Sequence, residues 1–538
     1  MNSTANVSRR GFVKGAAAAG IAAGAIGAQT ALADEAETET AAAKVIDISE
    51  VPADCKELTA DIIVVGGGGA GIATVAQGAE LGLTSVVFEK TSLLGGTFAC
   101  AGGIFAVDSH LQDEMGISDE ISALKLWKES MEFSHYMADP FVVKNFLEMS
   151  GPNIEWLEGK GVEFAKVYAT GISYKTVHEA KVDIDDPIGK NQAISDALLK
   201  YIDGTGLAQF LMETTVEQVI VDNGSVVGVL ARDNATGEVY KATGAGVVMA
   251  SGGFIGSPEL IRKYTSYDPD FFFNAGTAGR TGDGISMGEA AGAALHGMEA
   301  LMVFGGIIPE LWTAQTRVFD SASTRSPFLW LNEKGRRFTD ESNVFNFSYS
   351  GNAISHQKAL YTFYDEPKLA YMEENGGYYD GYPIGDGRAV IEELDADPTC
   401  DYVFKADSWE EMAEKTGLDK ETLLEEVARY NQMCYDGVDT DFGKESYLDP
   451  VDTPPFYGFK CHLGVYTSVG GLKVNDRCEV VNPSGEVISG LYAAGTDAGG
   501  LYGDTYDVSV CAASAAGFSM CSGRRCAMSI AEKAGQQA

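Results

Sequence analysis

The stretch DIIVVGGGGAGIATVAQGAELGLTSVVFEK, residues 61–90, decides the fold of this chain. An apolar run rich in β-branched residues leads into G-x-G-x-x-G at Gly66, Gly68 and Gly71; a helix-compatible run and a second apolar strand follow and end at Glu89. The glycines allow a tight turn and a close approach to a pyrophosphate, whose charge meets the N–H groups of the helix start. Glu89 follows where a carboxylate can accept hydrogen bonds from a ribose diol. The stretch therefore predicts a dinucleotide-binding unit rather than a plain glycine-rich turn.

Glycine-rich motifs return, in order, along the rest of the chain. They lie at residues 95–97, 101–103, 251–254, 279–284 and 490–500. Glycine lets a backbone approach a ligand closely, and a domain that binds only a nicotinamide dinucleotide needs the first motif alone. The later motifs therefore predict that the chain wraps a longer and flatter ligand.

The first 33 residues have the features of an export signal rather than of a folded domain. Arg9 and Arg10 form a twin-arginine pattern, a mild Ala/Gly-rich stretch follows, and residues 31–33 offer a small-x-small cleavage site. The alternative, an N-terminal anchor helix, is disfavoured because alanine and glycine are too weakly apolar to hold a membrane span well. We therefore predict export by the twin-arginine route to the periplasm or extracytoplasmic face, with no integral membrane segment in the mature chain.

The chain is strongly acidic, and its cysteines follow no metal-binding pattern. Its 39 Lys and Arg residues stand against 77 Asp and Glu residues, a formal net charge of −38, which argues against nucleic acid as a partner. An acidic surface would attract a basic electron carrier, although solubility alone explains it equally well. The nine cysteines form no C-x-x-C pair, so we predict free thiols, no metal site and no haem attachment, as suits a reducing or anaerobic habitat.

Changes in composition divide the chain into segments. Residues 34–58 are acidic at the start and rich in Ala, Thr and Glu, which predicts a flexible lead-in. Residues 59–302 hold the nucleotide-binding motif, and their alternation over 207–250 is typical of a β-meander. Residues 303–463 are richer in aromatic residues, proline and charged helices, so we interpret them as an inserted domain. Residues 464–538 return to glycine turns and complete the first domain.

In this order, the motifs resemble those of flavoproteins of the fumarate reductase/succinate dehydrogenase type, which include urocanate reductases and 3-ketosteroid Δ1-dehydrogenases. The resemblance covers about residues 60–300 and 464–525. It implies an α/β fold, with a Rossmann-like, glutathione-reductase-like FAD-binding domain and an inserted α+β capping domain whose closure would expel water from a hydride-transfer site. It implies FAD as cofactor, with Val216 reaching the adenine through its backbone. The residues implied to hold FAD are Gly66, Gly68, Ala70, Gly71, Glu89, Lys90, Gly96, Thr97, Gly102, Gly103, Val216, Gly252, Asp283, Gly495 and Asp497.

The chain departs from this family at the positions that bind substrate. Phe304 stands where fumarate reductases have a histidine, Phe345 stands where they have the proton-donating arginine, and Tyr506 stands where they have a carboxylate-clamping arginine. Tyr466 lies in a variant of the His-Thr-x-Gly-Gly motif, and Arg325 lies within one residue of a further family arginine. Because a dicarboxylate needs forked cationic donors, the changes disfavour fumarate. They predict a neutral or weakly charged, flat, partly aromatic substrate.

The sequence therefore predicts an exported FAD-dependent reductase of an activated C=C bond in an enone or enoate, active in anaerobic respiration. Tyr506, with Tyr466 or Arg325, is predicted to supply a proton or to polarise a carbonyl. The chain has no haem motif, so electrons are expected from a separate, cytochrome-like protein. Two alternatives stay open: a 3-ketosteroid-type Δ1-dehydrogenase, and a flavin-binding electron-transfer or ligand-binding protein without turnover.

Overall fold

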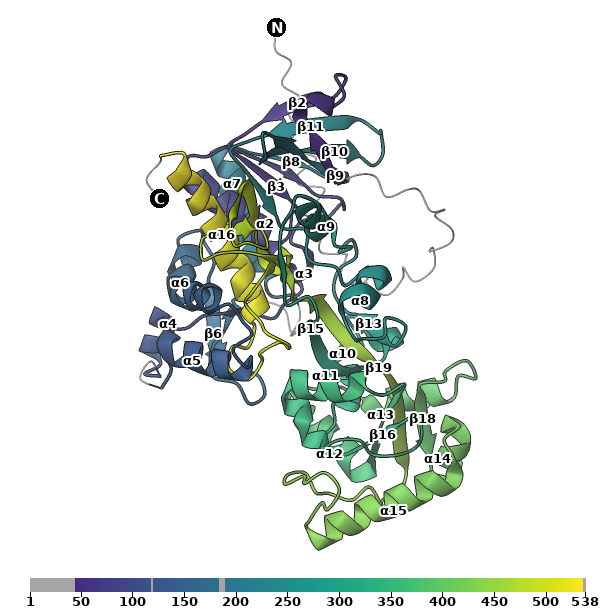
Figure 1. The fold of residues 1–538 in the computed structure, drawn as a ribbon. Helices are drawn as coiled ribbons and strands as arrows, with labels where there is room; N and C mark the ends of the chain where they lie inside the picture. The colour runs from purple at the N-terminus through teal and green to yellow at the C-terminus, as the bar shows by residue number, and fades with distance from the viewer. Residues whose placement is uncertain (1–43, 118–119, 183–188, 536–538) are drawn as a thin grey trace.

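The computed structural model describes residues 44–117, 120–182 and 189–535, so the predicted export signal lies outside the described residues. Figure 1 shows two lobes: one is built from the N-terminal and C-terminal parts of the chain, and the other from its middle third. Two strands, β15 (Leu301–Ile307) and β19 (Phe456–Ser468), lead from one lobe to the other. Among the described residues, none of the helices is long and apolar enough to cross a membrane.

The first lobe is organised around a six-stranded sheet in the order β21-β22-β12-β3-β4-β8. Its four central strands pair in parallel, and β3 is buried along its whole length, which explains the continuous apolar run in the sequence. Helices α2, α7 and α16 belong to the same lobe, and Gly523 of α16 lets the backbone of α2 approach closely at Ala70. The bounds are β3 Ile62–Val65, α2 Gly69–Glu80, β4 Ser85–Phe88, α7 Gln192–Thr205, β8 Ala208–Leu211, β12 Gly246–Met249, β21 Glu479–Val481, β22 Val487–Ala493 and α16 Ser514–Lys533.

A second, five-stranded sheet confirms the predicted meander and corrects the predicted lead-in. Strands β9, β10 and β11 form the antiparallel meander within residues 207–250. The lead-in was expected to be flexible, but its described part adds strands β1 and β2 in parallel at the two edges of this sheet. Backbone pairing with β9 and β11 thus gives this segment a regular structure, although its composition predicts a flexible one. The bounds are β1 Val45–Asp47, β2 Lys56–Thr59, β9 Thr214–Asp222, β10 Ser225–Asp233 and β11 Val239–Thr243.

Short elements complete the first lobe and position its loops. Helix α6 begins after Asp139, whose side chain accepts hydrogen bonds from the first backbone N–H groups, with Pro140 at the first helical position. The bounds are α3 Gly96–Ala99, β5 Ile104–Phe105, α4 His110–Glu114, α5 Ala123–Phe133, α6 Pro140–Glu158, β6 Phe164–Tyr168, β7 Val177–Ala180, α8 Pro258–Tyr264, α9 Asp283–Ala290, β14 Leu295–His296, β20 Gly471–Lys473 and β23 Ala498–Gly499.

The second lobe is an α+β unit built on β19, which pairs with β13, β15, β17 and β18. The lobe occupies the place that the sequence assigns to a capping domain, and we refer to it as the cap. Its bounds, with the adjoining β13, are β13 Phe272–Asn274, α10 Arg317–Thr324, β16 Leu329–Asn332, α11 Phe347–Ser355, β17 Leu360–Asp365, α12 Glu366–Asn375, α13 Gly387–Asp395, β18 Val403–Ala406, α14 Trp409–Thr416 and α15 Lys420–Asp436.

A buried ionic group ties the cap together. The Nε and Nη2 atoms of Arg337 donate to the carboxylate of Glu341 at 2.7 and 2.8 Å, and Nη2 also donates to Asp439 at 2.9 Å. Lys444 donates to Glu341 from the other side at 3.3 Å. The four side chains are almost fully buried. The R-F-x-x-E motif at Arg337 therefore contributes to the folding of the cap.

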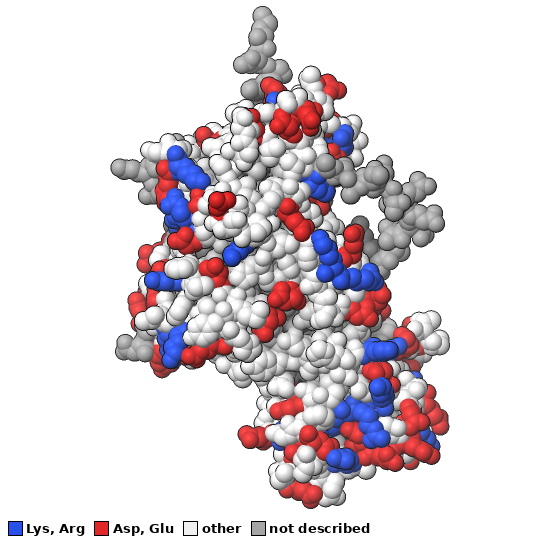
Figure 2. All heavy atoms as spheres, viewed as in Figure 1, with Lys and Arg blue, Asp and Glu red and all other residues white. Residues whose placement is uncertain are grey.

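Charge is spread unevenly over the face shown in Figure 2, where acidic and basic side chains crowd on the cap and a broad uncharged area covers the middle of the molecule. All nine cysteines carry free thiols, and six of them are buried.

Candidate active site

Two glycine loops lie side by side at the start of α2 and form a cradle. Gly68 and Gly95 form an isolated parallel bridge, and the N–H of Gly95 donates to the carbonyl oxygen of Gly67 at 2.9 Å. A Cβ atom placed on Gly71 would lie 2.0 Å from the carbonyl oxygen of Gly66, so Gly71 is required for packing inside the protein. A Cβ on Gly68 would meet no described atom within 4 Å. Gly68 therefore faces open space at the N-terminus of α2, where a pyrophosphate would meet unpaired N–H groups.

Valine in place of Gly68 is expected to impair binding of a dinucleotide cofactor without unfolding the protein. The backbone angles at Gly68, φ −75° and ψ −174°, suit a residue with a side chain, so the added methyl groups would fill the cradle alone. We expect affinity for the cofactor to fall about 5- to 150-fold, the equivalent of about 1–3 kcal/mol of overpacking. The melting temperature of the cofactor-free protein should stay unchanged.

Titration of cofactor into the cofactor-free Gly68→Val protein measures this effect. Gly204→Ala is a matched control, because Gly204 of α7 is an equally open position on the helix surface. Stoichiometric cofactor in the purified Gly68→Val protein would show that Gly68 does not face the cofactor.

Glu89 and Lys90 stand at the end of β4 beside the glycine cradle. The carboxylate of Glu89 accepts hydrogen bonds from the N–H of Gly67 at 2.8 Å and from the N–H and hydroxyl of Thr91 at 2.8 and 2.7 Å. Lys90 donates to the carboxylate of Asp283 at 2.6 Å. These contacts bring three of the predicted cofactor residues, Glu89, Lys90 and Asp283, together at the C-terminal end of β4. The role of Glu89 as a ribose-binding carboxylate stays a prediction.

Asp497 joins the loop after β12 to the C-terminal glycine motif. This buried carboxylate accepts hydrogen bonds from the N–H and hydroxyl of Ser251 at 2.6 and 2.8 Å and from the N–H of Gly253 at 2.8 Å. Burial raises the pKa of Asp497, and these hydrogen bonds oppose the rise. Gly495, at φ +60°, lies against Ala70 of α2. Motifs that are far apart in the sequence therefore meet around the end of the central sheet.

The other predicted cofactor residues are spread around this region. Thr97 shares a hydroxyl–hydroxyl hydrogen bond of 2.9 Å with Thr277, which brings α3 to the loop before α9. Gly96 and Gly252 have φ of +53° and +96°, conformations that favour glycine. Gly102 lies in the turn between α3 and β5, Gly103 lies beside the carbonyl group of His178, and Val216 is buried in β9 opposite Ala231.

An aromatic cluster lines the cap where it meets the first lobe. The rings of Phe304 and Tyr466 stack with their centroids 4.1 Å apart. Trp312 and Phe347 pack on Phe304 at 5.9 and 6.5 Å. The guanidinium carbon of Arg325 lies 4.7 Å from the centroid of the Phe304 ring. The structure therefore brings together two of the predicted catalytic residues, Tyr466 and Arg325.

Tyr466 is suited to donate a proton. Burial raises the pKa of its hydroxyl, although the nearby Arg325 and Arg317 side chains oppose the rise. The phenol is therefore protonated at neutral pH. Its ring is held by the stack on Phe304, so the proton is carried on a rigid group.

Tyr506 lies in a different environment. Its ring packs on Tyr502 with the centroids 5.1 Å apart, its side chain is buried, and its hydroxyl lies near Ser514 at the start of α16. Burial raises its pKa to about 12. Within the described chain, its ring contact and hydrogen bonds involve neither Tyr466 nor Arg325, so the catalytic role of Tyr506 stays a prediction.

Arg280 of the 279–284 motif forms three hydrogen bonds at the junction of the two lobes. Its guanidinium donates to the carbonyl oxygens of Thr277 at 2.9 Å and Tyr466 at 2.6 Å, and to the side-chain oxygen of Asn274 at 2.6 Å. Burial lowers its pKa to about 10, which leaves it charged at neutral pH. The backbone of Tyr466 is thus fixed from the cofactor side.

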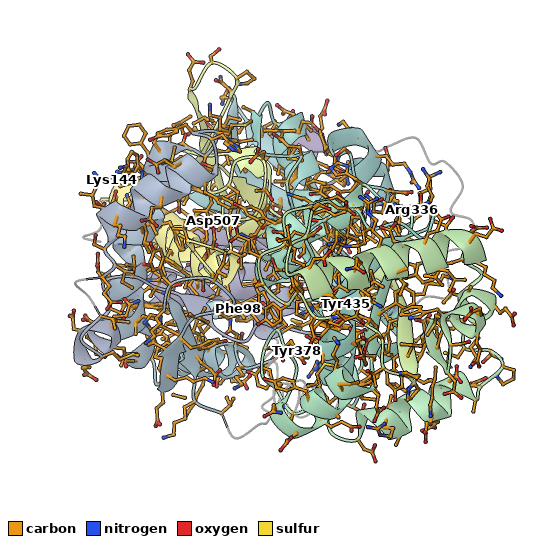
Figure 3. The ribbon with its side chains drawn as sticks, turned by 90° about the horizontal axis from the view of Figure 1, so that it is seen from below. Phe98, Lys144, Arg336, Tyr378, Tyr435 and Asp507 are labelled. Carbon is orange, nitrogen blue, oxygen red and sulfur yellow. The ribbon has the colours of Figure 1, made fainter. Side chains whose placement is uncertain are left out.

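Sequence reasoning missed several residues of this cluster. Tyr379, Phe347 and Trp312 belong to no motif, and Asp380 follows Tyr379 in a loop of the cap. Only the richness of 303–463 in aromatic residues signalled a lining of this kind. Figure 3 shows Tyr378 in the cap close to its boundary with the lobe that carries Phe98.

Comparisons with known proteins agree with this geometry. A family model described as "FAD binding domain" matches residues 61–509. Vinyl phenol reductase from Lactiplantibacillus plantarum is 34% identical over 489 residues, which are 89% of this chain and 97% of that protein. NADH:acrylate oxidoreductase from Vibrio harveyi is 27% identical over 507 residues, which are 83% of this chain and 48% of that protein, so the chain spans about half of it.

A solved structure shows the same fold. It is the 3-ketosteroid Δ1-dehydrogenase from Sterolibacterium denitrificans in complex with 1,4-androstadiene-3,17-dione. It is similar with a TM-score of 0.72 at 19% identity, over 88% of this chain and 100% of that one.

Proposed function

This chain belongs to the flavoprotein family of the FAD binding domain, and we propose that it is an exported reductase of C=C bonds conjugated to a flat, aromatic or enone-bearing group. It is an FAD-dependent oxidoreductase of the fumarate reductase type, and the open cradle at Gly68 fits the cofactor. The observation that carries the proposal on substrate is the stack of Tyr466 on the buried Phe304, because it holds a partly exposed phenol ring in the site expected for substrate. The similarity to vinyl phenol reductase supports the same class of substrate.

Each group in the site has a defined task in such a reaction. Bound FAD supplies hydride when it is reduced. Glu89 and the cradle at Gly68 hold the ribose and pyrophosphate of the cofactor, and Arg280 fixes the strand that carries Tyr466. Tyr466 donates the proton that completes the saturated bond, with Tyr506 and Arg325 as the other candidate groups. The aromatic rings of the cap exclude water from the reacting carbon atoms.

Electrons are proposed to come from a separate protein. The name of the Vibrio relative indicates NADH as its donor, and the chain spans only about half of that relative. A twin-arginine signal would place the enzyme where no NADH pool exists, so a carrier of the cytochrome type is the donor that fits. The acidic surface supports a carrier with a basic docking face.

An anaerobic substrate screen tests the proposed function. The FAD-loaded enzyme is reduced with methyl viologen and mixed with 4-vinylphenol, 4-hydroxybenzylideneacetone, acrylate, fumarate or a 3-ketosteroid-4-ene, and viologen oxidation is followed. We expect turnover with the first two compounds and little with fumarate. Brisk oxidation of a 3-ketosteroid by an artificial acceptor, without reduction of any compound, would instead indicate a Δ1-dehydrogenase. A flavin that no compound reoxidises would indicate a protein without turnover.

A further inference from the structure

Arg325 is a buried cation that lies among aromatic rings rather than beside a carboxylate. It is the C-cap residue that follows α10, and only 5% of its surface is exposed. Its guanidinium carbon lies 4.7, 5.7 and 5.8 Å from the ring centroids of Phe304, Phe347 and Tyr379. Rings on several sides hold the guanidinium in place and keep water away from it.

The hydrogen-bonding capacity of Arg325 is largely unused. Its Nη1 atom donates to the hydroxyl of Ser321 at 3.3 Å. The hydroxyl of Tyr466 lies near the guanidinium, but Nε and Nη2 form no hydrogen bond of normal geometry with any described residue. Arg337, which is equally buried, shows the usual arrangement, with two carboxylates on its N–H groups. Leaving a buried donor without a partner destabilises the protein unless a ligand accepts from it. The two free N–H groups lie on one edge of the guanidinium, so one group of oxygen atoms can accept from both.

The acidic groups nearest to Arg325 do not neutralise it in the way that a salt bridge would. One carboxylate oxygen of Asp320 accepts a hydrogen bond from the N–H of Ile308 at 2.9 Å, and burial raises the pKa of Asp320 to about 7. Asp380 accepts from Ser321 at 3.1 Å, and burial raises its pKa as well. Neither forms an ion pair with Arg325 within the described chain. Tyr379 and Tyr466, the phenols that face the guanidinium, are kept protonated by burial, and Arg317 adds a second positive charge near Tyr466.

The surroundings of Arg325 suit a flat ring. Phe347 and Tyr379 stack with their centroids 5.2 Å apart, and the stack continues through Phe345, 6.3 Å from Tyr379. Phe345, Phe347, Tyr379 and Tyr466 are each only half-buried, so their rings line an accessible surface. A planar aromatic molecule can therefore rest on ring faces that lie next to Arg325, and the side chains that cover the guanidinium must shift before the molecule meets its free edge.

We propose that Arg325 binds the ionised oxygen of a phenol-type substrate and so selects an aromatic ring that carries an acidic oxygen. This inference rests on the proposed function and narrows its substrate class. Both free N–H groups can donate to the single oxygen of a phenolate, which spreads its charge into the ring, and the aromatic surroundings of Arg325 match that ring. Phe347 and Tyr379, which are half-buried, offer that ring a matching apolar surface. The substrate thus carries one negative charge, which is the weakly charged case of the neutral or weakly charged substrate that the sequence predicts.

Binding of 4-nitrophenol tests this inference without turnover. The FAD-loaded enzyme is titrated with 4-nitrophenol, 4-nitrobenzoate and the neutral 4-nitroanisole, with no electron donor present. We expect saturable binding of 4-nitrophenol and an absorbance change showing that the bound phenol is more ionised than in buffer at the same pH. In Arg325→Met, affinity for 4-nitrophenol should fall about 10- to 150-fold and the ionisation change should vanish, while affinity for 4-nitroanisole changes less than about threefold.

Two further variants keep the result interpretable. Arg325→Lys retains the charge but not the two-pronged edge, so it should restore part of the affinity if Arg325→Met folds poorly. Arg232→Met removes an exposed arginine far along the chain and should change nothing.

Several results would overturn the inference. They are equal losses for 4-nitrophenol and 4-nitroanisole, tighter binding of 4-nitrobenzoate, or no saturable binding of 4-nitrophenol by the unmodified enzyme. An enzyme that binds 4-nitrophenol in the expected way but reduces no C=C bond would instead contradict the proposed function alone.

Discussion

Replacing Tyr466 with phenylalanine is expected to lower kcat about 10²- to 10⁴-fold, the usual contribution of a positioned proton donor. The substitution removes one oxygen atom and keeps the ring that stacks on Phe304 at 4.1 Å. The hydrogen bond from Arg280 to position 466 uses the backbone carbonyl oxygen, so the strand stays fixed. FAD content should therefore stay normal, and the loss should fall on the proton-transfer step alone.

Anaerobic kinetics with reduced methyl viologen measure this effect, and two other tyrosines serve as comparisons. Tyr379→Phe alters a phenol in the same aromatic cluster, and Tyr506→Phe alters the phenol that packs on Tyr502. If Tyr466 is the donor, each comparison variant should lose less than about tenfold in kcat. A larger loss in Tyr506→Phe than in Tyr466→Phe would assign the proton to Tyr506.

Replacing Arg337 with methionine is expected to destabilise the cap by about 3–5 kcal/mol, because it leaves buried carboxylates without their main partner. Glu341 and Asp439 have side chains that are 0% and 1% exposed, and Lys444 alone cannot pair with both. The control is Arg232→Met, which breaks an ion pair whose side chains are 45% and 36% exposed. That pair is screened by solvent and should contribute less than about 1 kcal/mol. Urea unfolding followed by tryptophan fluorescence measures both changes.

The stability lost in Arg337→Met should depend on pH. Burial tends to raise the pKa of Asp439, but the hydrogen bonds and charge of Arg337 outweigh burial and lower that pKa from 3.8 to about 2. A carboxylate with a lowered pKa stabilises the fold above its ordinary pKa, and this contribution is lost as the pH falls from about 4 to about 2. The difference between Arg337→Met and the unmodified protein should therefore shrink over that range. A constant difference would place the effect in packing rather than in charge.

The glycine loops of the predicted cofactor site could be recognised from the sequence. Gly66, Gly68 and Gly71 have roles fixed by local geometry, namely a positive φ, an open face and a close contact, so the spacing alone identifies them. The meander over 207–250 was equally clear, because alternation and turn residues are local signals.

The substrate-binding half depends on contacts between distant parts of the chain. Phe304 and Tyr466 come from β15 and β19, which pair in an irregular register, and Tyr379 comes from a cap loop between α12 and α13. No periodicity within any one of these segments places their rings together. The pairing of β1 and β2 with distant strands escaped prediction for the same reason. The unpaired edge of Arg325 is likewise visible only once the surrounding groups are in place.

The long strand β19 constrains how the enzyme opens for its substrate. It runs through 13 residues and is paired along its length with β13, β15, β17 and β18, so it belongs to both lobes at once. Domains that open widely usually rotate about a hinge of a few loop residues. In this protein such a rotation would have to break hydrogen bonds between paired strands. The cap is therefore expected to move relative to the first lobe only by a small bending of β19. Substrate entry would then depend on movement of the loop around Tyr379. The size of the side chains in this loop would limit the size of the substrate.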